Sequence, residues 1–159
     1  MHVQQPIRDR IIAEVERSLL AIGTSAAFNS ATVPKVYRTA QDAYNAEAYP
    51  WCFVAGAAEE YERSKTRPFA EYHKTVTLDI EYRDQYPTTY SEDAWCARMV
   101  ADVEYALRDW TLGGECGEMD IVSNARSETD NSDGDRVVAV SFVVKATYRI
   151  ARNDPATRV

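Results

Sequence analysis

Apolar residues recur at helical spacing in two separate stretches of the chain. The first follows Pro6, which suits the first turn of a helix, and runs to Gly23, a natural helix stop. Its apolar stripe consists of Ile7, Ile11, Val15, Leu19 and Ile22. The second runs from Ser91, a good helix cap, to Trp110, and its stripe consists of Trp95, Met99, Val103 and Leu107. Both patterns predict amphipathic helices, each with one buried face.

Other stretches have the patterns of β-strands. The clearest alternation puts Val76, Leu78 and Ile80 on one face and polar residues on the other, as in a strand with one buried and one wet face. Another stretch, around Phe53, is continuously apolar, which is typical of a strand covered on both faces. The predicted strands are residues 33–38, 50–56, 72–82, 119–122 and 135–152.

The order of these elements is helix, three strands, helix, two strands. Two helices can pack on one face of a mostly antiparallel sheet, so the pattern predicts an α+β fold with about five strands. The 159 residues suit a single domain spanning 1–159. An exposed hairpin is expected near residues 59–70, where the chain turns acidic and then basic, and a short C-terminal tail at 151–159. The sheet face away from the helices would then meet solvent, a helix or a neighbouring subunit.

Composition narrows the class of protein. Hydrophobic residues make up 45% of the chain and charged residues 27%, a balance that suits a soluble domain. No apolar run approaches the roughly 20 residues of a membrane span. The first residues lack the order of a secretory signal, so a cytosolic protein is expected. Cys52, Cys96 and Cys116 are odd in number and widely spaced, which indicates neither a disulfide framework nor a zinc site.

The net charge of −7 is unevenly distributed along the chain. Residues 86–135 carry a net charge of −9 and residues 136–159 carry +4, whereas residues 1–85 carry −2. Opposite patches of this kind favour head-to-tail contact between copies, although uneven solvation of a monomer explains them equally well. The overall acidity argues against tight binding to duplex DNA, which requires several cations that neutralise phosphates.

Motifs of catalysis and nucleotide binding are absent from the sequence, which has no phosphate-binding loop, dinucleotide-binding fingerprint or nucleophile elbow. His73 could form a dyad with Cys52 or Cys96, but small buried cysteines and a surface histidine are the better interpretation. Tyrosines in predicted loops favour protein interfaces instead, because a tyrosine buries much area at small entropic cost. These are Tyr44, Tyr49, Tyr86 and Tyr90.

Two acidic clusters are better explained by solvated turns than by chemistry. Residues 130–135 resemble a calcium loop, but the spacing puts Thr129 and Val140 where acidic ligands are needed. The second cluster could serve acid–base catalysis, yet it suits the flank of a charged hairpin better. Its members are Glu59, Glu60 and Glu62.

Several segments together carry a resemblance to a known family. They are the opening helix 7–16, the strand 33–38, the buried strand 50–56 followed by Glu59 and Glu60, the run 100–107 leading into Leu112-Gly113-Gly114, and the closing 146–149 with Asn153-Asp154-Pro155. In the order, length and composition of these segments, the chain resembles the tail terminator (tail completion) proteins of long-tailed bacteriophages. The resemblance covers nearly the whole chain.

The resemblance implies an α+β subunit that assembles with itself into a hexameric ring. In that family the ring caps the head-proximal end of the tail tube, stops tube polymerisation and offers the surface that joins the head. The implied partners are the tail tube protein and a head–tail connector or neck protein, with DNA passing through the lumen without specific binding. The family has no catalytic residues and no cofactor. The implied location is the neck region of the virion tail, after assembly in the host cytoplasm.

Two groups of residues are expected at the interfaces of such a ring, because they combine predicted exposure with, in their basic members, charge opposite to the acidic middle of the chain. They are Arg63, Lys65 and Arg67 in the hairpin, and Arg149, Arg152 and Asp154 near the C-terminus. Solubilising surface charge explains each of them equally well. The alternatives for the whole chain are another neck, adaptor or baseplate ring protein, and a small hydrolase or ligand-binding domain that uses His73.

Overall fold

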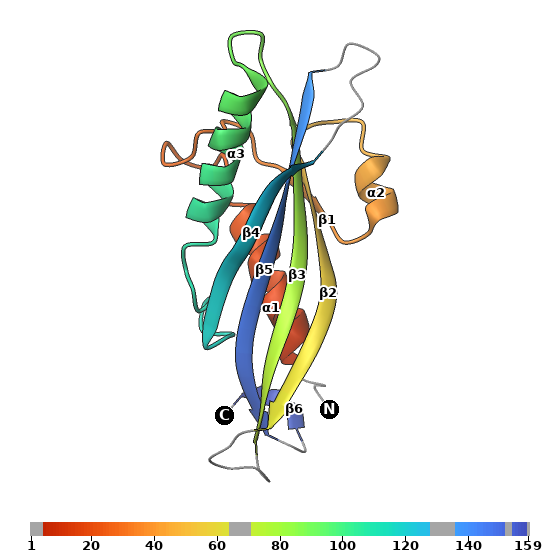
Figure 1. Ribbon diagram of the computed structural model, residues 1–159, viewed down its shortest axis with the longest axis vertical. Helices are drawn as coiled ribbons and strands as arrows, with labels where there is room; N and C mark the ends of the chain where they lie inside the picture. Colours follow the sequence, from red (N-terminus) through yellow and green to blue (C-terminus); the bar gives the residue numbers. More distant parts are fainter. Residues whose placement is uncertain (1–4, 64–70, 128–135, 152–153, 159) are drawn as a thin grey trace.

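A computed structural model of the chain describes residues 5–63, 71–127, 136–151 and 154–158 (Figure 1). The helices are α1 (Ile7–Leu19), α2 (Ala40–Tyr44) and α3 (Glu92–Ala106). The strands are β1 (Lys35–Tyr37), β2 (Trp51–Arg63), β3 (Glu71–Gln85), β4 (Glu118–Ser127), β5 (Val137–Ala151) and β6 (Asp154–Arg158). None of the helices in these ranges is long and apolar enough to cross a membrane.

The strands form one mixed, mostly antiparallel sheet. Its order is β1-β2-β3-β5-β4, and only the β1–β2 pair is parallel. The short strand β6 pairs antiparallel with the end of β5. The predicted α+β class and its sheet of about five strands are therefore confirmed.

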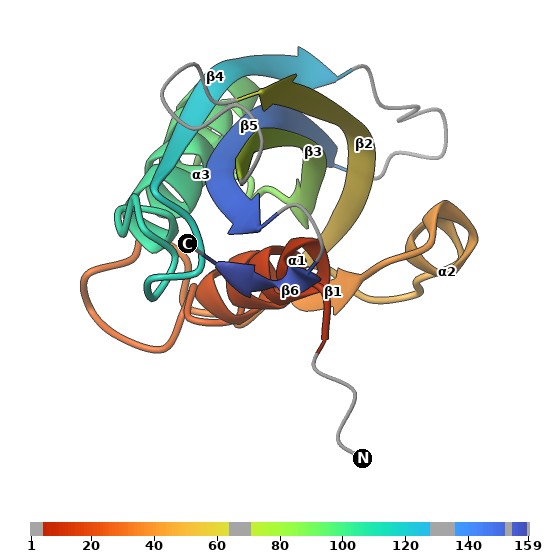
Figure 2. The same cartoon turned by 90° about the horizontal axis from the view of Figure 1, so that it is seen from below.

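Both long helices pack on the same face of the sheet, as predicted. Seen end-on, the sheet is strongly twisted and its concave side faces α1 (Figure 2). Ile11 and Val15 of α1 and Val103 of α3 are fully buried against this side, together with Leu78 and Phe142 from the two central strands. Burial of this apolar surface is the main stabilising term for the arrangement.

The opposite face of the sheet is covered in part by the short helix α2, which the polar stretch 41–49 did not reveal. Thr39 caps this helix by accepting a hydrogen bond from the Asp42 amide at 3.2 Å. Its Tyr44 meets Trp51 edge-on at 5.7 Å between ring centroids and leaves Trp51 only 2% exposed. The guanidinium of Arg83 stacks on both rings, so an aromatic and cationic cluster seals this end of the outer face.

Several predicted boundaries differ from the structure. Helix α1 ends at Leu19 rather than near Gly23, β4 continues to Ser127 rather than ending at 122, and the predicted tail 151–159 contains strand β6. Strand β2 continues to Arg63, so the acidic run 59–62 belongs to a strand rather than to a hairpin tip. Helix α3 ends at Ala106, four residues before Trp110. The reason is the loop that follows, where the Asp109 side chain accepts backbone hydrogen bonds from Thr111 and Gly113 and so builds a turn instead of another helical turn.

Candidate functional site at the distal end of the sheet

Three of the predicted interface residues lie at one end of the sheet. Arg63 ends β2, Arg149 lies near the end of β5 and Asp154 begins β6. The register places them at the same end: Arg63 is opposite Tyr72, which is opposite Ile150, and Asp154 is opposite Ala151. We call this the distal end of the sheet; it lies at the bottom of Figure 1. The predicted Lys65, Arg67 and Arg152 lie outside the described residues.

The side chain of Arg149 is exposed on the outer face of the distal end. It lies on β5 directly opposite His73 of β3, whose side chain is half-buried. On the helix side of the same end, β6 lies beside α1 (Figure 2). The distal end therefore combines a β2–β3 hairpin, the last residues of β5 and the C-terminal strand in one surface.

A polar cluster that the sequence did not predict lies on the helix side of this end. Glu59 is its centre, and it accepts a hydrogen bond from the Tyr148 hydroxyl at 2.9 Å. Its carboxylate also lies 3.7 Å from the Arg8 guanidinium and 3.9 Å from the Lys74 ammonium. Lys74 in turn stacks on the exposed ring of Tyr61 at 4.3 Å. Burial and the hydrogen bond to Glu59 raise the pKa of Tyr148, so its hydroxyl stays protonated.

A β-bulge directs Glu59 to this side of the sheet. Gly56 pairs with Leu78 but Ala58 pairs with Thr77, so one extra residue shifts the alternation of β2. Without the bulge, Glu59 would face the outer side. Gly56 also makes room for Arg8, because a Cβ atom at this position would lie 2.6 Å from the Arg8 guanidinium. A glycine inside a strand pattern was the one signal in the sequence that could have indicated this bulge.

An open hollow of about 570 Å³ adjoins the distal end. On one side it is lined by His73, Thr147 and Arg149, and on the other by the loop that joins α3 to β4, including Thr111 and Cys116. Its size falls within the usual range for small-ligand sites.

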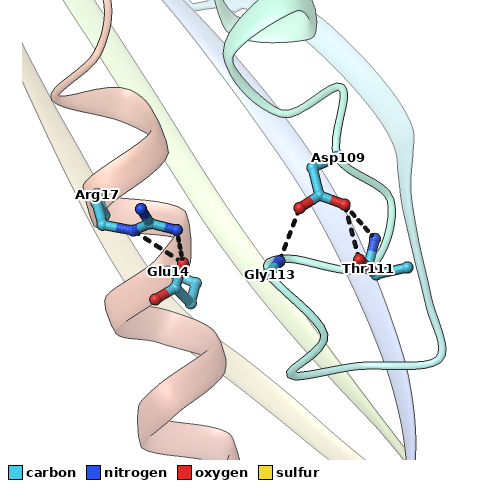
Figure 3. Close-up of polar contacts among 5 residues, drawn as sticks. All are labelled: Glu14, Arg17, Asp109, Thr111 and Gly113. Atoms are coloured by element: carbon cyan, nitrogen blue, oxygen red, sulfur yellow. Dashed lines mark hydrogen bonds and ion pairs between the residues drawn. The ribbon is translucent and has the colours of Figure 1, made fainter.

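The loop beside this hollow is held by hydrogen bonds from its backbone and side chains to Asp109 (Figure 3). The Asp109 carboxylate accepts hydrogen bonds from the Thr111 amide and hydroxyl at 3.0 and 2.7 Å and from the Gly113 amide at 2.7 Å. These bonds, the Gly113 amide first, lower the pKa of Asp109. Leu112 is buried although its φ is +48°, a strained value for leucine. The loop thus holds Trp110 outward with 60% of its surface exposed.

The conceivable Cys–His dyad is not formed. Cys52 pairs with Tyr82 on β3, nine residues from His73, which is about 30 Å along an extended strand. Cys52 is also fully buried, and burial raises the pKa of its thiol. Cys96 lies on α3, close enough to Arg126 of β4 for the arginine charge to act on its thiol. Through Val140 of β5, Arg126 is in register with Tyr82 of β3, and not with His73.

The three glutamates of the acidic cluster in β2 do not share one face of the strand. Glu59 faces the helices, whereas Glu60 and Glu62 alternate to the outer face of β2. The residues that the structure describes contain no group of three or more His, Cys, Asp or Glu side chains able to hold a metal ion. The calcium-like turn at 130–135 lies outside those residues.

Comparison with known proteins adds no assignment, because no protein-family model and no curated protein matches the chain.

Proposed function

We propose that this chain is the subunit of a homo-hexameric ring that caps the head-proximal end of a bacteriophage tail tube. The ring ends tube polymerisation and offers the surface that joins the head through a connector or neck protein. The observation that supports this proposal is that Arg63, Arg149 and Asp154 lie on three separate strands at the same end of the sheet.

Charge complementarity gives the ring a means of closing. The flank formed by α3, its following loop and β4 exposes several acidic side chains, among them Asp93, Glu104 and Asp120. The distal end exposes Arg149. When the distal end of one copy meets the acidic flank of the next, each copy uses two different surfaces, and such heterologous contacts close into a ring.

A ring of this kind ends a polymer because its two faces differ. One face matches the end of the tail tube, and the other accepts the connector but no further tube ring. An acidic subunit also suits a lumen through which DNA passes without being retained, because like charges repel.

The proposal is tested by the mass of the purified protein across a concentration series, with negative-stain images of the largest species. A closed ring of six copies is the expected result. If the protein stays a monomer, it is mixed with purified tail tubes, where it should bind one end and block further growth. A monomer that leaves tubes unbound and growing contradicts the proposal.

A neck adaptor or baseplate ring is distinguished from a terminator by the particles that form without it. Loss of a terminator should give overlong tails, whereas loss of a neck adaptor should give tails of correct length that remain unattached. Electron microscopy of particles assembled without this chain separates the two.

A second candidate function rests on the hollow beside His73, whose volume suits a small ligand. A hydrolase or ligand-binding domain would show a ligand-dependent rise in melting temperature that His73→Ala abolishes. It would also be a monomer or dimer in the mass measurement, so the two functions give different results in the same experiment.

A further inference from the structure

The end of the sheet opposite the distal end carries a cluster of arginines stacked on aromatic rings. It comprises Tyr86 and Tyr90 in the loop between β3 and α3, Trp95 and Arg98 on α3, and Arg136 just before β5. We call it the arginine–aromatic patch. The loop that carries its tyrosines lies at the top of Figure 1, far from β6.

Stacking fixes both guanidinium groups of the patch. The Cζ atom of Arg98 lies 4.8 Å from the ring centroid of Tyr90 and 5.7 Å from that of Trp95. The Cζ atom of Arg136 lies 4.4 Å from the ring centroid of Tyr86. Arg136 also donates to the Tyr90 carbonyl at 3.2 Å, so both arginines contact the same tyrosine. A guanidinium held on a ring face is pre-organised and loses little further freedom when it binds.

Neither arginine has an acidic partner in the part of the chain that the structure describes, although the surrounding segment is the most acidic of the sequence. Arg126, from the same segment, forms ion pairs with both Glu92 and Asp93. Arg98 makes only a 3.5 Å hydrogen bond to the Asn29 carbonyl, and its Nε is buried without a hydrogen-bond partner among the described residues. The buried Nε of Arg98 is closed to a partner, so the capacity of the patch to bind lies in the terminal N–H groups of Arg98 and in the exposed guanidinium of Arg136.

We propose that the arginine–aromatic patch binds carboxylate side chains on an acidic segment of another protein. A guanidinium presents its N–H groups in a planar fork that matches the two oxygens of a carboxylate. Two such forks beside one tyrosine suit two acidic side chains of one short segment.

A nucleic acid fits the patch less well than an acidic protein segment. Its repeated phosphates require a row of cations, whereas the patch offers only the two stacked guanidinium groups of Arg98 and Arg136 among the described residues. The proposal concerns the end of the sheet away from Arg63 and Arg149, so it does not depend on the ring.

The test is the binding of a fluorescein-labelled hexaglutamate peptide, measured by fluorescence anisotropy at low salt. The double variant Arg98→Gln/Arg136→Gln should bind at least tenfold more weakly than the parent chain. The matched control is Arg17→Gln/Arg108→Gln, which changes the net charge equally. Arg108 is likewise stacked on a tyrosine, at 4.0 Å from the Tyr105 centroid, and Arg17 is largely exposed, so binding should change less than twofold.

Three results would overturn the proposal: no binding of hexaglutamate by the parent chain, equal weakening by both double variants, or tighter binding of a hexathymidylate than of hexaglutamate. Circular dichroism and thermal melting of each variant confirm that it is folded. If the Arg98 change prevents folding, the single variant Arg136→Gln serves instead, because Arg136 is exposed and lies outside the helices and strands. It should weaken hexaglutamate binding at least threefold, and unchanged binding contradicts the proposal.

Discussion

At the scale of single residues, Asp102 is the side chain on which the loop before β1 depends. It is 2% exposed on α3 and accepts hydrogen bonds from the Asn29 amide at 2.6 Å, the Ser30 amide at 2.8 Å and the Asn29 side-chain amide at 3.0 Å. Asp102→Ala removes the buried carboxylate and leaves these three donors without their acceptor. We expect the free energy of unfolding to fall by about 3 kcal/mol, as measured by urea denaturation.

Asp109 provides the matched control for this prediction. It also accepts three hydrogen bonds from neighbouring groups, but it is fully exposed, so water can replace it as the acceptor. Asp109→Ala should therefore cost clearly less stability than Asp102→Ala. Equal losses for the two variants would show that burial does not set the value of these bonds.

The contacts of Glu59 could not be predicted from the sequence, because they depend on a β-bulge. In a regular strand, the alternation that puts Val54 on the helix side would put Glu59 on the outer side. The extra residue between Gly56 and Ala58 reverses that alternation, and only then does Glu59 meet Tyr148, which is 89 residues further along the chain. A partner so distant in sequence cannot be inferred from local pattern.

At the scale of elements, helix α3 is joined to the sheet by a hydrogen bond to Asp84, a carboxyl group with a raised pKa. Asp84 on β3 is 8% exposed and accepts hydrogen bonds from the Trp95 indole at 3.1 Å and the Gln85 amide at 2.8 Å. Burial raises the pKa of Asp84 from 3.8 to about 6, although these two hydrogen bonds oppose the rise. The folded protein therefore binds this proton more tightly than the unfolded chain.

The sign of the resulting pH dependence follows from linkage. Because the pKa of Asp84 is higher in the folded state, its contribution makes the protein more stable as pH falls from about 6 to about 4, and the cost of the buried charge is fully present above pH 6. Asp84→Asn removes this dependence. We expect the difference in unfolding free energy between variant and parent to shift by about 2 kcal/mol between pH 7.5 and pH 4. Urea denaturation at both pH values measures it, and parallel pH profiles would contradict the assignment.

Long elements with a single strong period were predictable, whereas short or interrupted ones were not. The stripe of α1 and the alternation of β3 each repeat over several turns or pairs, so burial of one face determines the element. Helix α2 has only five residues and β6 only five, too few for a period to appear. The end of α3 depends on the side chain of Asp109, which outweighs the apolar spacing of Leu107 and Trp110.

At the scale of the whole molecule, the basic and acidic parts of the sequence lie in different parts of the structure. The basic C-terminal part runs along β5 to the distal end, while the acidic part forms α3, its loop and β4 along one flank (Figure 1). The sequence indicated opposite patches, but only strand pairing could place Arg63 and Arg149 at the same end of the sheet, with β3 between their strands. Local patterns carry no information on which strands become neighbours.

Arg149 tests whether the distal end joins copies of the chain. Its side chain is exposed on the outer face of β5, and Lys145 is exposed on the same face four residues nearer the middle of the strand. Both changes to glutamate alter the net charge equally and on the same strand. Arg149→Glu should raise the concentration needed for assembly at least tenfold, because it places an acid against the acidic flank of the neighbouring copy. Lys145→Glu should change that concentration less than threefold.

Mass photometry across a dilution series gives both values, and since the contact is electrostatic, the difference should shrink at 0.5 M salt. If both variants assemble like the parent chain, or both fail equally, the contact between copies lies elsewhere on the subunit.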